Sequence, residues 1–357
     1  MDFKDLNTRI RDGGRISEAE ALALFASDDI FSLGELADYA NRRRNKKFVH
    51  FIRNMHINPG NICINRCKFC AFSRSRDEDG AYSYTIPEMV ERAESVKGRV
   101  SEFHIVGGLN PEMDFGFYKE LFGAIKQSVP GVFIKALTAV EVDYIAKLSG
   151  LTARKVLEGL RDAGLDSMPG GGAEIFRKGV RDRLCPEKIP GGKWLRIMET
   201  AHGLGIKTTA TMLFGHLETH RDRVDHLRRL RELQDKTGGF LAFIPLPFHH
   251  KNTKVEGAKP VSGLDILKTI AVSRIYLDNF DHVKAYWIMT GEKLAQTALL
   301  FGADDLDGTV IEEKITHMAG AESKEFMTVD EITSMIIKAG KVPVERDTFY
   351  NRLKVWS

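Results

Sequence analysis

The chain has little cysteine, almost no net charge and no long apolar segment. Four cysteines, and an opening MDFKDLN that lacks the apolar core of a signal peptide, lead us to expect a cytoplasmic protein with reduced thiols. The 52 basic and 49 acidic residues leave a net charge of +3, and the basic residues are dispersed, so no nucleic-acid partner is expected. The longest strongly apolar run, 240–248, is too short to cross a bilayer, so no membrane partner is expected.

Low-complexity segments and obvious internal repeats are also absent from the sequence. The composition, 43% hydrophobic and 28% charged, is that of a globular protein. With neither nucleic acid nor a membrane indicated, a small molecule is the expected partner.

The chain does show a regular alternation of short β-type runs and amphipathic segments. An eighth run near 301–311 has strand character only at its ends, and the seven clear runs are 51–58, 102–107, 132–138, 165–169, 207–214, 240–246 and 283–288. Apolar residues at three- and four-residue spacing between these runs indicate helices. This order predicts a parallel sheet with right-handed crossovers, and at this length an α/β fold of the closed (β/α)8 TIM-barrel type.

We divide the chain into three predicted segments. Residues 1–47 form a polar N-terminal helical extension, in which Ser17 has the spacing of a capping box. Residues 48–320 form the barrel. Residues 321–357 are predicted to be a C-terminal helical segment packed on the barrel, with a helix around 328–339.

Three of the four cysteines, Cys63, Cys67 and Cys70, fall within the eight residues CINRCKFC. Thiolates select iron–sulfur clusters, zinc or copper(I), and a cubane cluster held by three cysteines leaves one iron open. Flanking proline, glycine and asparagine residues indicate a loop rather than a buried helix face. A zinc site would need a fourth ligand, which His56 or His104 could supply, so the local motif leaves both metals as alternatives.

The spacing C-x3-C-x2-C, with an aromatic residue before the last cysteine, resembles the signature of the radical S-adenosylmethionine (SAM) superfamily. The resemblance implies that Cys63, Cys67 and Cys70 ligate a [4Fe–4S] cluster and that SAM binds the open iron through its amino and carboxylate groups. Gly107 and Gly108, after the second run, match the glycine pair that contacts the SAM amino group in this superfamily. A glycine pair alone more often marks a turn.

Barrel enzymes carry their chemistry at the C-terminal ends of the strands, so polar residues after the later runs are further candidates. Glu141 follows the third run, and Ser167 and Glu174 belong to the fourth run and the glycine-rich segment after it. Carboxylates there could accept hydrogen bonds from ribose or from the SAM ammonium group, although surface salt bridges and helix caps are nearly as common. Arg181 and Lys188 follow, and a cation there could pair with the methionine carboxylate. We predict cofactor contacts for Glu141, Ser167, Glu174 and Arg181.

Histidines gather after the fifth and sixth runs. FGHLET places His216, Glu218 and Thr219 at the predicted barrel rim, and IPLPFHHKNT adds His249 and His250. A rim histidine could be an acid, a base or the partner of a carboxylate, although an isolated histidine is more often structural. We predict that His249 is the catalytic residue on the substrate side.

Longer segments resemble one family within this superfamily. Over most of residues 45–351 the chain is similar to the aminofutalosine synthases of the futalosine route to menaquinone, in the segments HINPGNICINRCKFCAF, HIVGGLNP, GLDSMPGGGAEIF, TATMLFGHLET, LQDKTGGFLAFIPLPFH, GADDLDGT and PVERDTFYN. The resemblance implies that SAM is a cosubstrate, cleaved to methionine and a 5′-deoxyadenosyl radical. That radical adds to 3-[(1-carboxyvinyl)oxy]benzoate and gives 6-amino-6-deoxyfutalosine and bicarbonate. Cations for two substrate carboxylates and an electron donor such as flavodoxin or ferredoxin are also implied.

Other functions stay open. The dehypoxanthine futalosine cyclases of the same route, whose radical abstracts hydrogen, are similar, as is one subunit type of the deazaflavin (F0) synthases. A cyclase is expected to have tryptophan after the proline of the sixth run and glutamine in place of His249, so FIPL followed by Phe-His favours the synthase. Asn110 and His250 depart from the family pattern and receive no role, and Cys185 is interpreted as a structural thiol. A noncatalytic barrel with zinc in the cysteine loop is the alternative of another class.

Overall fold

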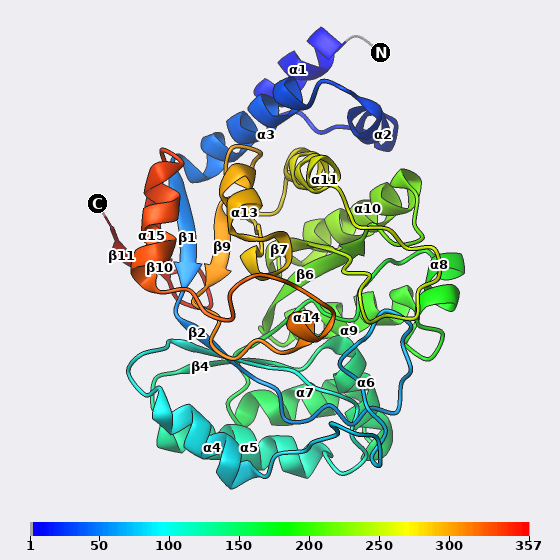
Figure 1. The fold of residues 1–357 in the computed structure, drawn as a ribbon, viewed down its shortest axis with the longest axis vertical. Helices are drawn as coiled ribbons and strands as arrows, with labels where there is room; N and C mark the ends of the chain where they lie inside the picture. The colour runs from blue at the N-terminus through cyan, green and yellow to red at the C-terminus, as the bar shows by residue number, and fades with distance from the viewer. Residues whose placement is uncertain (1–2, 357) are drawn as a thin grey trace.

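Eight parallel strands close into a barrel in the computed structural model, which describes residues 3–356 (Figure 1). Met1, Asp2 and Ser357 lie outside the described residues, and with them the ends of the predicted segments 1–47 and 321–357 and the first two residues of MDFKDLN.

Seven of the barrel strands form one parallel sheet in chain order: β2 (Asn54–Ile57), β3 (Glu102–Ile105), β4 (Phe133–Ala136), β5 (Ser167–Met168), β6 (Lys207–Phe214), β7 (Phe240–Pro247) and β8 (His282–Val283). The eighth strand, β9 (Asp305–Gly308), pairs in parallel with β1 (Phe48–Ile52), which directly precedes β2. Parallel bridges join Lys284 to Asp305 and Met55 to Ile311, so β9 connects β8 back to the first strand. The predicted (β/α)8 barrel is confirmed.

Helices follow the strands and cover the barrel: α4 (Ile86–Ser95), α5 (Phe115–Ser128), α6 (Ala139–Leu148), α7 (Ala153–Asp162), α8 (Lys178–Leu184), α9 (Gly191–Gly203), α10 (His220–Thr237), α11 (Gly263–Tyr276), α12 (Trp287–Thr290) and α13 (Glu292–Ala298). Threonine N-caps with an acidic residue three positions later begin α4, α6 and α10, which satisfies backbone N–H groups at those ends. The described helices include none with the length and hydropathy of a bilayer-spanning helix.

The N-terminal helices α1 (Phe3–Arg11), α2 (Glu18–Ala26) and α3 (Ile30–Asn45) lie at the end of the barrel where the strands begin (Figure 1). Ser17 forms the expected capping box with Glu20 at the start of α2. The α2 helix contacts both α10 and α11, and α3 packs along α11. The Nδ2 of Asn45 donates a 2.9 Å hydrogen bond to the carbonyl of Asp281, just before β8. The extension therefore leaves the opposite barrel end open.

The C-terminal part is not helical throughout, which corrects the prediction for residues 321–357. The short helix α14 (Ile315–Met318) precedes it, and α15 (Val329–Lys338) matches the expected helix. Two strands then follow, β10 (Val342–Arg346), parallel to β1, and β11 (Arg352–Val355), antiparallel to β10. The alternation in KVPVER is too short to be distinguished from a loop by periodicity alone, and pairing with β1 decides its structure.

Buried ion pairs explain how the acidic segment DDLDG becomes a barrel strand. Asp304 contacts Arg274 and His282, Asp305 accepts a 2.7 Å hydrogen bond from Arg346 Nε, and Asp307 pairs with Lys284. Within residues 3–356, His50, His282 and Asp304 are the one group of metal-ligating side chains with ligand atoms within 4.8 Å of one another. The Asp304 carboxylate already forms ion pairs with Arg274 and His282. We therefore interpret this group as a network of ion pairs and not as a metal site.

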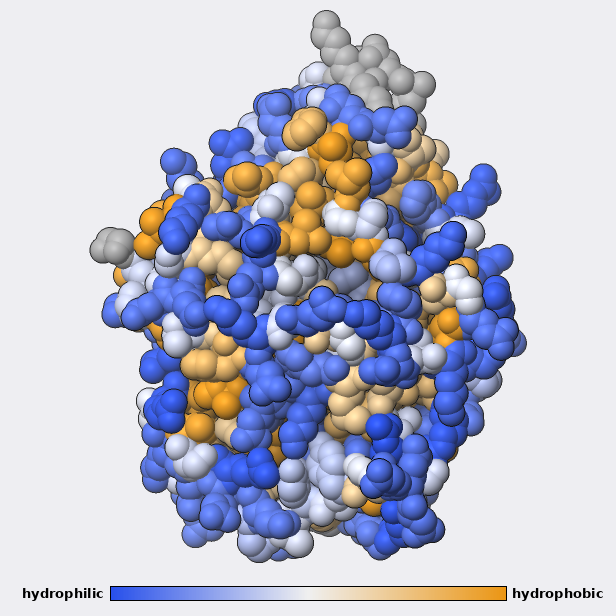
Figure 2. Space-filling model, viewed as in Figure 1, coloured by the Kyte–Doolittle hydropathy of each residue, from blue (hydrophilic) through white to orange (hydrophobic). Residues whose placement is uncertain are grey.

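The surface in the view of Figure 2 is mostly hydrophilic, with apolar side chains gathered around α3, α11 and α13. Large exposed apolar residues of the molecule include Phe31, Leu264 and Leu300. None of these three residues lines the cavity described below.

The buried Arg346–Asp305 pair yields a test of barrel closure. Replacing one partner of a buried pair leaves the other charge uncompensated, so Arg346→Met should lower the free energy of unfolding by about 3 kcal/mol or more. Urea titration followed by circular dichroism measures the change. Arg352→Met, on the exposed strand β11, is the matched control and should stay within about 0.5 kcal/mol of the parent. Equal unfolding of the two variants would contradict the role given to this pair.

Candidate active site

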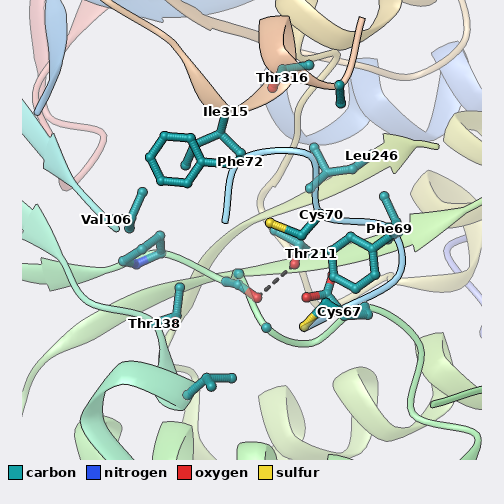
Figure 3. A pocket seen from close by; sticks show the side chains of 18 of the residues that line it. Cys67, Phe69, Cys70, Phe72, Val106, Thr138, Thr211, Leu246, Ile315 and Thr316 are labelled. Carbon is teal, nitrogen blue, oxygen red and sulfur yellow. Dashed lines mark hydrogen bonds between the residues drawn. The ribbon is translucent and has the colours of Figure 1, made fainter. Parts of the chain in front are cut away.

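A cavity of about 340 Å³ lies at the C-terminal ends of the barrel strands. Cys63, Cys67 and Cys70 all line it, and they belong to the cysteine loop, residues 58–85, between β2 and α4. Figure 3 shows Cys67 and Cys70 reaching into the cavity from this loop, with Ile315 of α14 on the side opposite to Thr138. The expectation that the cysteines follow a barrel strand and share one space is met by this arrangement.

Close backbone packing seats the cysteine loop against the end of β3. A Cβ on Gly108 would lie 2.2 Å from the carbonyl oxygen of Ile62, and one on Gly107 would lie 2.9 Å from that of Gly60. The N–H of Gly108 donates to the Gly60 carbonyl at 2.9 Å, and the N–H of Ile64 donates to Leu109 at 3.1 Å. Both glycines line the cavity, but the structure gives them a packing reason that is independent of SAM.

The three thiols suit a multi-iron cluster better than a single zinc ion. Burial raises the pKa of Cys63 and raises that of Cys67 to about 12, so a metal has to displace protons from neutral thiols. Two thiolates on one tetrahedral zinc would lie about 3.8 Å apart, since Zn–S bonds measure about 2.3 Å. Among the described residues, the three sulfurs are not found as a preformed group of metal ligands, either alone or with His56 or His104. In a cubane cluster each thiolate binds a different iron.

Glu141 is buried beside Gly107 and holds the edge of the cavity together. Its carboxylate accepts hydrogen bonds from the N–H of Thr138 at 2.6 Å and from the N–H of Gly107 at 3.1 Å, while its own N–H donates to the Thr138 hydroxyl. Burial raises the pKa of Glu141, and these hydrogen bonds oppose that shift. The carboxylate lines the cavity, so its predicted cofactor contact would come in addition to this positioning role.

Glu174 and Lys188 form a charged pair at the cavity wall. Their Oε1 and Nζ atoms lie 2.5 Å apart, and Lys188 also lies 4.8 Å from the ring centroid of Phe69. Burial raises the pKa of Glu174, but Lys188 and then Arg181 lower it more, so the pKa lies below its ordinary value. The carboxylate is therefore ionised at neutral pH.

Arg181 does not reach the cavity, in contrast to its predicted contact with the cofactor. The buried guanidinium donates to backbone carbonyls of the connection after β5, including those of Ala173 and Ile189 at 2.5 and 2.6 Å. It therefore shapes the glycine-rich wall, and Lys188 is the cation of this connection that lines the cavity. Both residues follow the same strand, and only packing distinguishes them.

Ser167 and Cys185 also lie outside the cavity lining. The Ser167 hydroxyl donates a 2.8 Å hydrogen bond to the carbonyl of Lys207, so the structure does not support its predicted cofactor contact. Cys185 is buried at the C-terminal end of α8, where burial raises the pKa of its thiol. Its position agrees with the structural role expected for it.

Of the rim histidines, His249 is the one that lines the cavity. Its Nε2–H donates to the carbonyl of Met289 at 2.9 Å, and burial lowers the pKa of the imidazole. His216 and Glu218 instead fold back on the turn before α10, where the carboxylate accepts a 2.8 Å hydrogen bond from Arg223 Nε. His250 is not part of the lining.

The sequence analysis did not predict several residues that line the cavity, and it considered two of them, His56 and His104, only as possible zinc ligands. His56 and His104 line the cavity together with charged and polar side chains from the later strands and α14, which are Lys135, Lys284, Tyr286, Asp307, Glu313 and Thr316. The lysine inside the apolar run VFIKALT was a usable signal, because a charged residue inside a barrel strand needs a partner. The others lie in predicted strands, in segments that follow them or in α14, where nothing in the sequence shows which side chains face inward.

Two family models match consecutive parts of the chain. The radical SAM superfamily model matches residues 57–230, and the model of the CofH/MqnC C-terminal region matches residues 237–356. Methylornithine synthase (PylB), a solved structure, has a TM-score of 0.77 at 17% identity and covers 95% of this chain and 97% of its own, which shows a shared fold.

Two relatives match nearly the whole chain. An aminodeoxyfutalosine synthase from Thermus thermophilus is 42% identical over 353 residues, covering 98% of this chain and 95% of the relative. A 5-amino-6-(D-ribitylamino)uracil–L-tyrosine 4-hydroxyphenyl transferase from Methanoculleus marisnigri is 43% identical over 346 residues, covering 95% and 94%. The chain therefore belongs to the radical SAM superfamily of enzymes and, within it, to the family of the aminodeoxyfutalosine synthases and the related 4-hydroxyphenyl transferases.

Proposed function

We propose that the protein is an aminofutalosine synthase of menaquinone biosynthesis, which joins the 5′-deoxyadenosyl group of SAM to 3-[(1-carboxyvinyl)oxy]benzoate. The products are 6-amino-6-deoxyfutalosine, methionine and bicarbonate. The observation that carries the proposal is that His249, where the synthase and cyclase patterns differ, lines the same cavity as the three cysteines. The 42% identity to the Thermus thermophilus synthase supports the proposal. Because a tyrosine transferase is 43% identical, identity alone does not decide the substrate, which has to be tested.

In this proposal Cys63, Cys67 and Cys70 hold a [4Fe–4S] cluster whose fourth iron is left for SAM, since Cys185 lies outside the cavity. When bound and reduced by a flavodoxin or ferredoxin, the cluster supplies the electron that cleaves SAM. Gly107 offers backbone to the cofactor, and the Glu174–Lys188 pair can exchange hydrogen bonds with its charged groups. Apolar cavity residues such as Phe72, Leu246 and Ile315 keep water from the radical.

The hydrogen bonding of His249 defines what it can do for the substrate. Because Nε2–H is committed to the Met289 carbonyl, the neutral ring has no second proton, and Nδ1 makes no hydrogen bond with the described residues. The ring can therefore accept a proton or a hydrogen bond at Nδ1. This argues for proton acceptance during the rearrangement and against donation to a carboxylate, the two roles considered from the sequence.

The cysteine assignment is tested by iron retention. Single alanine replacements of Cys63, Cys67 and Cys70 should abolish the brown colour, the bound iron and SAM cleavage after anaerobic reconstitution, because each thiol is a cluster ligand. Cys185→Ala is the matched control and should keep all three properties. A colourless wild-type protein that retains zinc would instead support the noncatalytic barrel, and iron loss confined to Cys185→Ala would overturn the assignment.

Product analysis separates the synthase from the cyclase. If the adenosyl group is joined to the substrate, methionine should match the adduct one for one and free 5′-deoxyadenosine should be a minor by-product. Mass spectrometry of anaerobic reactions with SAM, reductant and the carboxyvinyl ether measures these ratios. Stoichiometric 5′-deoxyadenosine without adduct would reject the synthase.

The role of His249 is tested in the same assay. Without an acceptor at Nδ1, His249→Ala should lower adduct formation by about tenfold or more and lower uncoupled SAM cleavage less, since general-base groups contribute about 10²–10⁴-fold. His250→Ala, outside the cavity lining, is the control and should behave like the wild type. Wild-type adduct yield from His249→Ala would remove this residue from the chemistry.

A further inference from the structure

Three ionisable side chains form a row across neighbouring strands inside the barrel. His56 of β2 pairs in register with His104 of β3, and His104 pairs with Lys135 of β4. Because side chains at paired positions point to the same face of a sheet, the three share one level of the barrel interior, and all three line the cavity. We call this row, His56, His104 and Lys135, the basic row.

Within the described part of the chain, the histidines of the basic row have no hydrogen-bonding partner. Their rings lie 4.6 Å apart between centroids, and no described residue forms a hydrogen bond with a ring nitrogen of either one. The Nε2 atom of His56 is fully buried without a partner, and the His56 side chain is more than nine-tenths buried. A buried polar group without a hydrogen bond is costly, so native proteins keep one where a ligand or water completes it.

Both lysines near the basic row are paired with carboxylates before any ligand enters, and Glu313 also acts on His56. Lys135 Nζ lies 2.6 Å from Glu102 Oε1, and on the other side of the interior Lys284 pairs with Asp307. Burial lowers the pKa of both His56 and His104, so the imidazoles are neutral and each still has one N–H to donate. The row therefore presents hydrogen-bond donors beside a lysine ammonium, a combination that suits a carboxylate.

The basic row lies deeper in the barrel than the strand ends, so it would contact the part of a substrate that does not react. His104 precedes Gly107 by three residues along β3 and its end, which corresponds to about 10 Å of extended chain. The cysteines and Gly107 lie at the strand ends, where SAM would bind. A molecule that places its reacting double bond near SAM extends its other end toward the basic row.

We propose that the basic row binds the ring carboxylate of the substrate, with His104 as the principal donor and Lys135 as the neighbouring cation. This inference rests on the proposed function and deepens it by assigning one of the two substrate carboxylates to the barrel interior. The enol-ether carboxylate stays at the level of the cofactor. The row thereby selects aryl carboxylates over aryl groups that lack an anion at this position.

Binding to the oxidised holoenzyme tests the inference without turnover. Isothermal titration in the presence of SAM compares 3-[(1-carboxyvinyl)oxy]benzoate with the analogue in which hydrogen replaces the ring carboxylate. The wild type should bind the carboxylate about tenfold or more tightly than the analogue, since hydrogen bonds to charged groups are the strong ones. His104→Leu should lose most of this preference, with the remainder coming from Lys135, whereas His104→Gln, of similar size and still a donor, should keep it.

Iron content, SAM affinity and the circular dichroism spectrum confirm that each variant is intact, and His104→Ala serves for comparison if His104→Leu does not fold. A preference for the ring carboxylate that stays at the wild-type level in His104→Leu or His104→Ala overturns the inference, as does a wild type without preference. A wild type that forms adduct but shows no preference rejects only the basic row. A wild type that neither binds nor converts the carboxyvinyl ether rejects the proposed function itself.

Discussion

The site depends on the direct contact of two backbones, that of the cysteine loop and that of the segment after β3. Gly108 leaves no room for a side chain, because a Cβ would meet the Ile62 carbonyl oxygen at 2.2 Å. The Gly108 N–H donates to Gly60, and Ile64 donates to Leu109, so the two segments are joined on both sides of this contact. The close approach turns the three thiols toward the cavity and fixes the loop before any metal binds.

Buried polar side chains in and behind the cavity wall hold that wall in place. Glu141 caps α6 and at the same time receives the Gly107 N–H, and Arg181 uses its guanidinium on carbonyls of the glycine-rich connection. Neither arrangement requires a bound cofactor. Because these side chains are already fixed by hydrogen bonds, they lose little conformational freedom when a charged ligand binds. A preorganised wall also limits side reactions of a reactive radical.

The barrel interior holds buried charges that the apolar core of an ordinary TIM barrel lacks. Glu102 and Lys135 face each other at 2.6 Å, and Lys284 and Asp307 pair at the other side of the cavity. Such pairs contribute little net stability, since desolvation offsets their attraction. Their presence in the cavity is better explained by recognition of polar ligands. Relatives with different named activities are about equally identical to this chain, so overall identity does not distinguish between their substrates.

Sequence alone determined the barrel, the loop that the three cysteines share and the place of His249 at a strand end, because strand and helix periods and strand-end positions are local properties of the chain. The tertiary structure decided which residues of a long connection face inward. Lys188 lines the cavity and Arg181 does not, although both follow β5. It also decided that 342–346 pairs with β1, and that His104 stands in register with histidine and lysine on adjacent strands. Register and side-chain direction arise from contacts between segments far apart in sequence, so no local pattern encodes them.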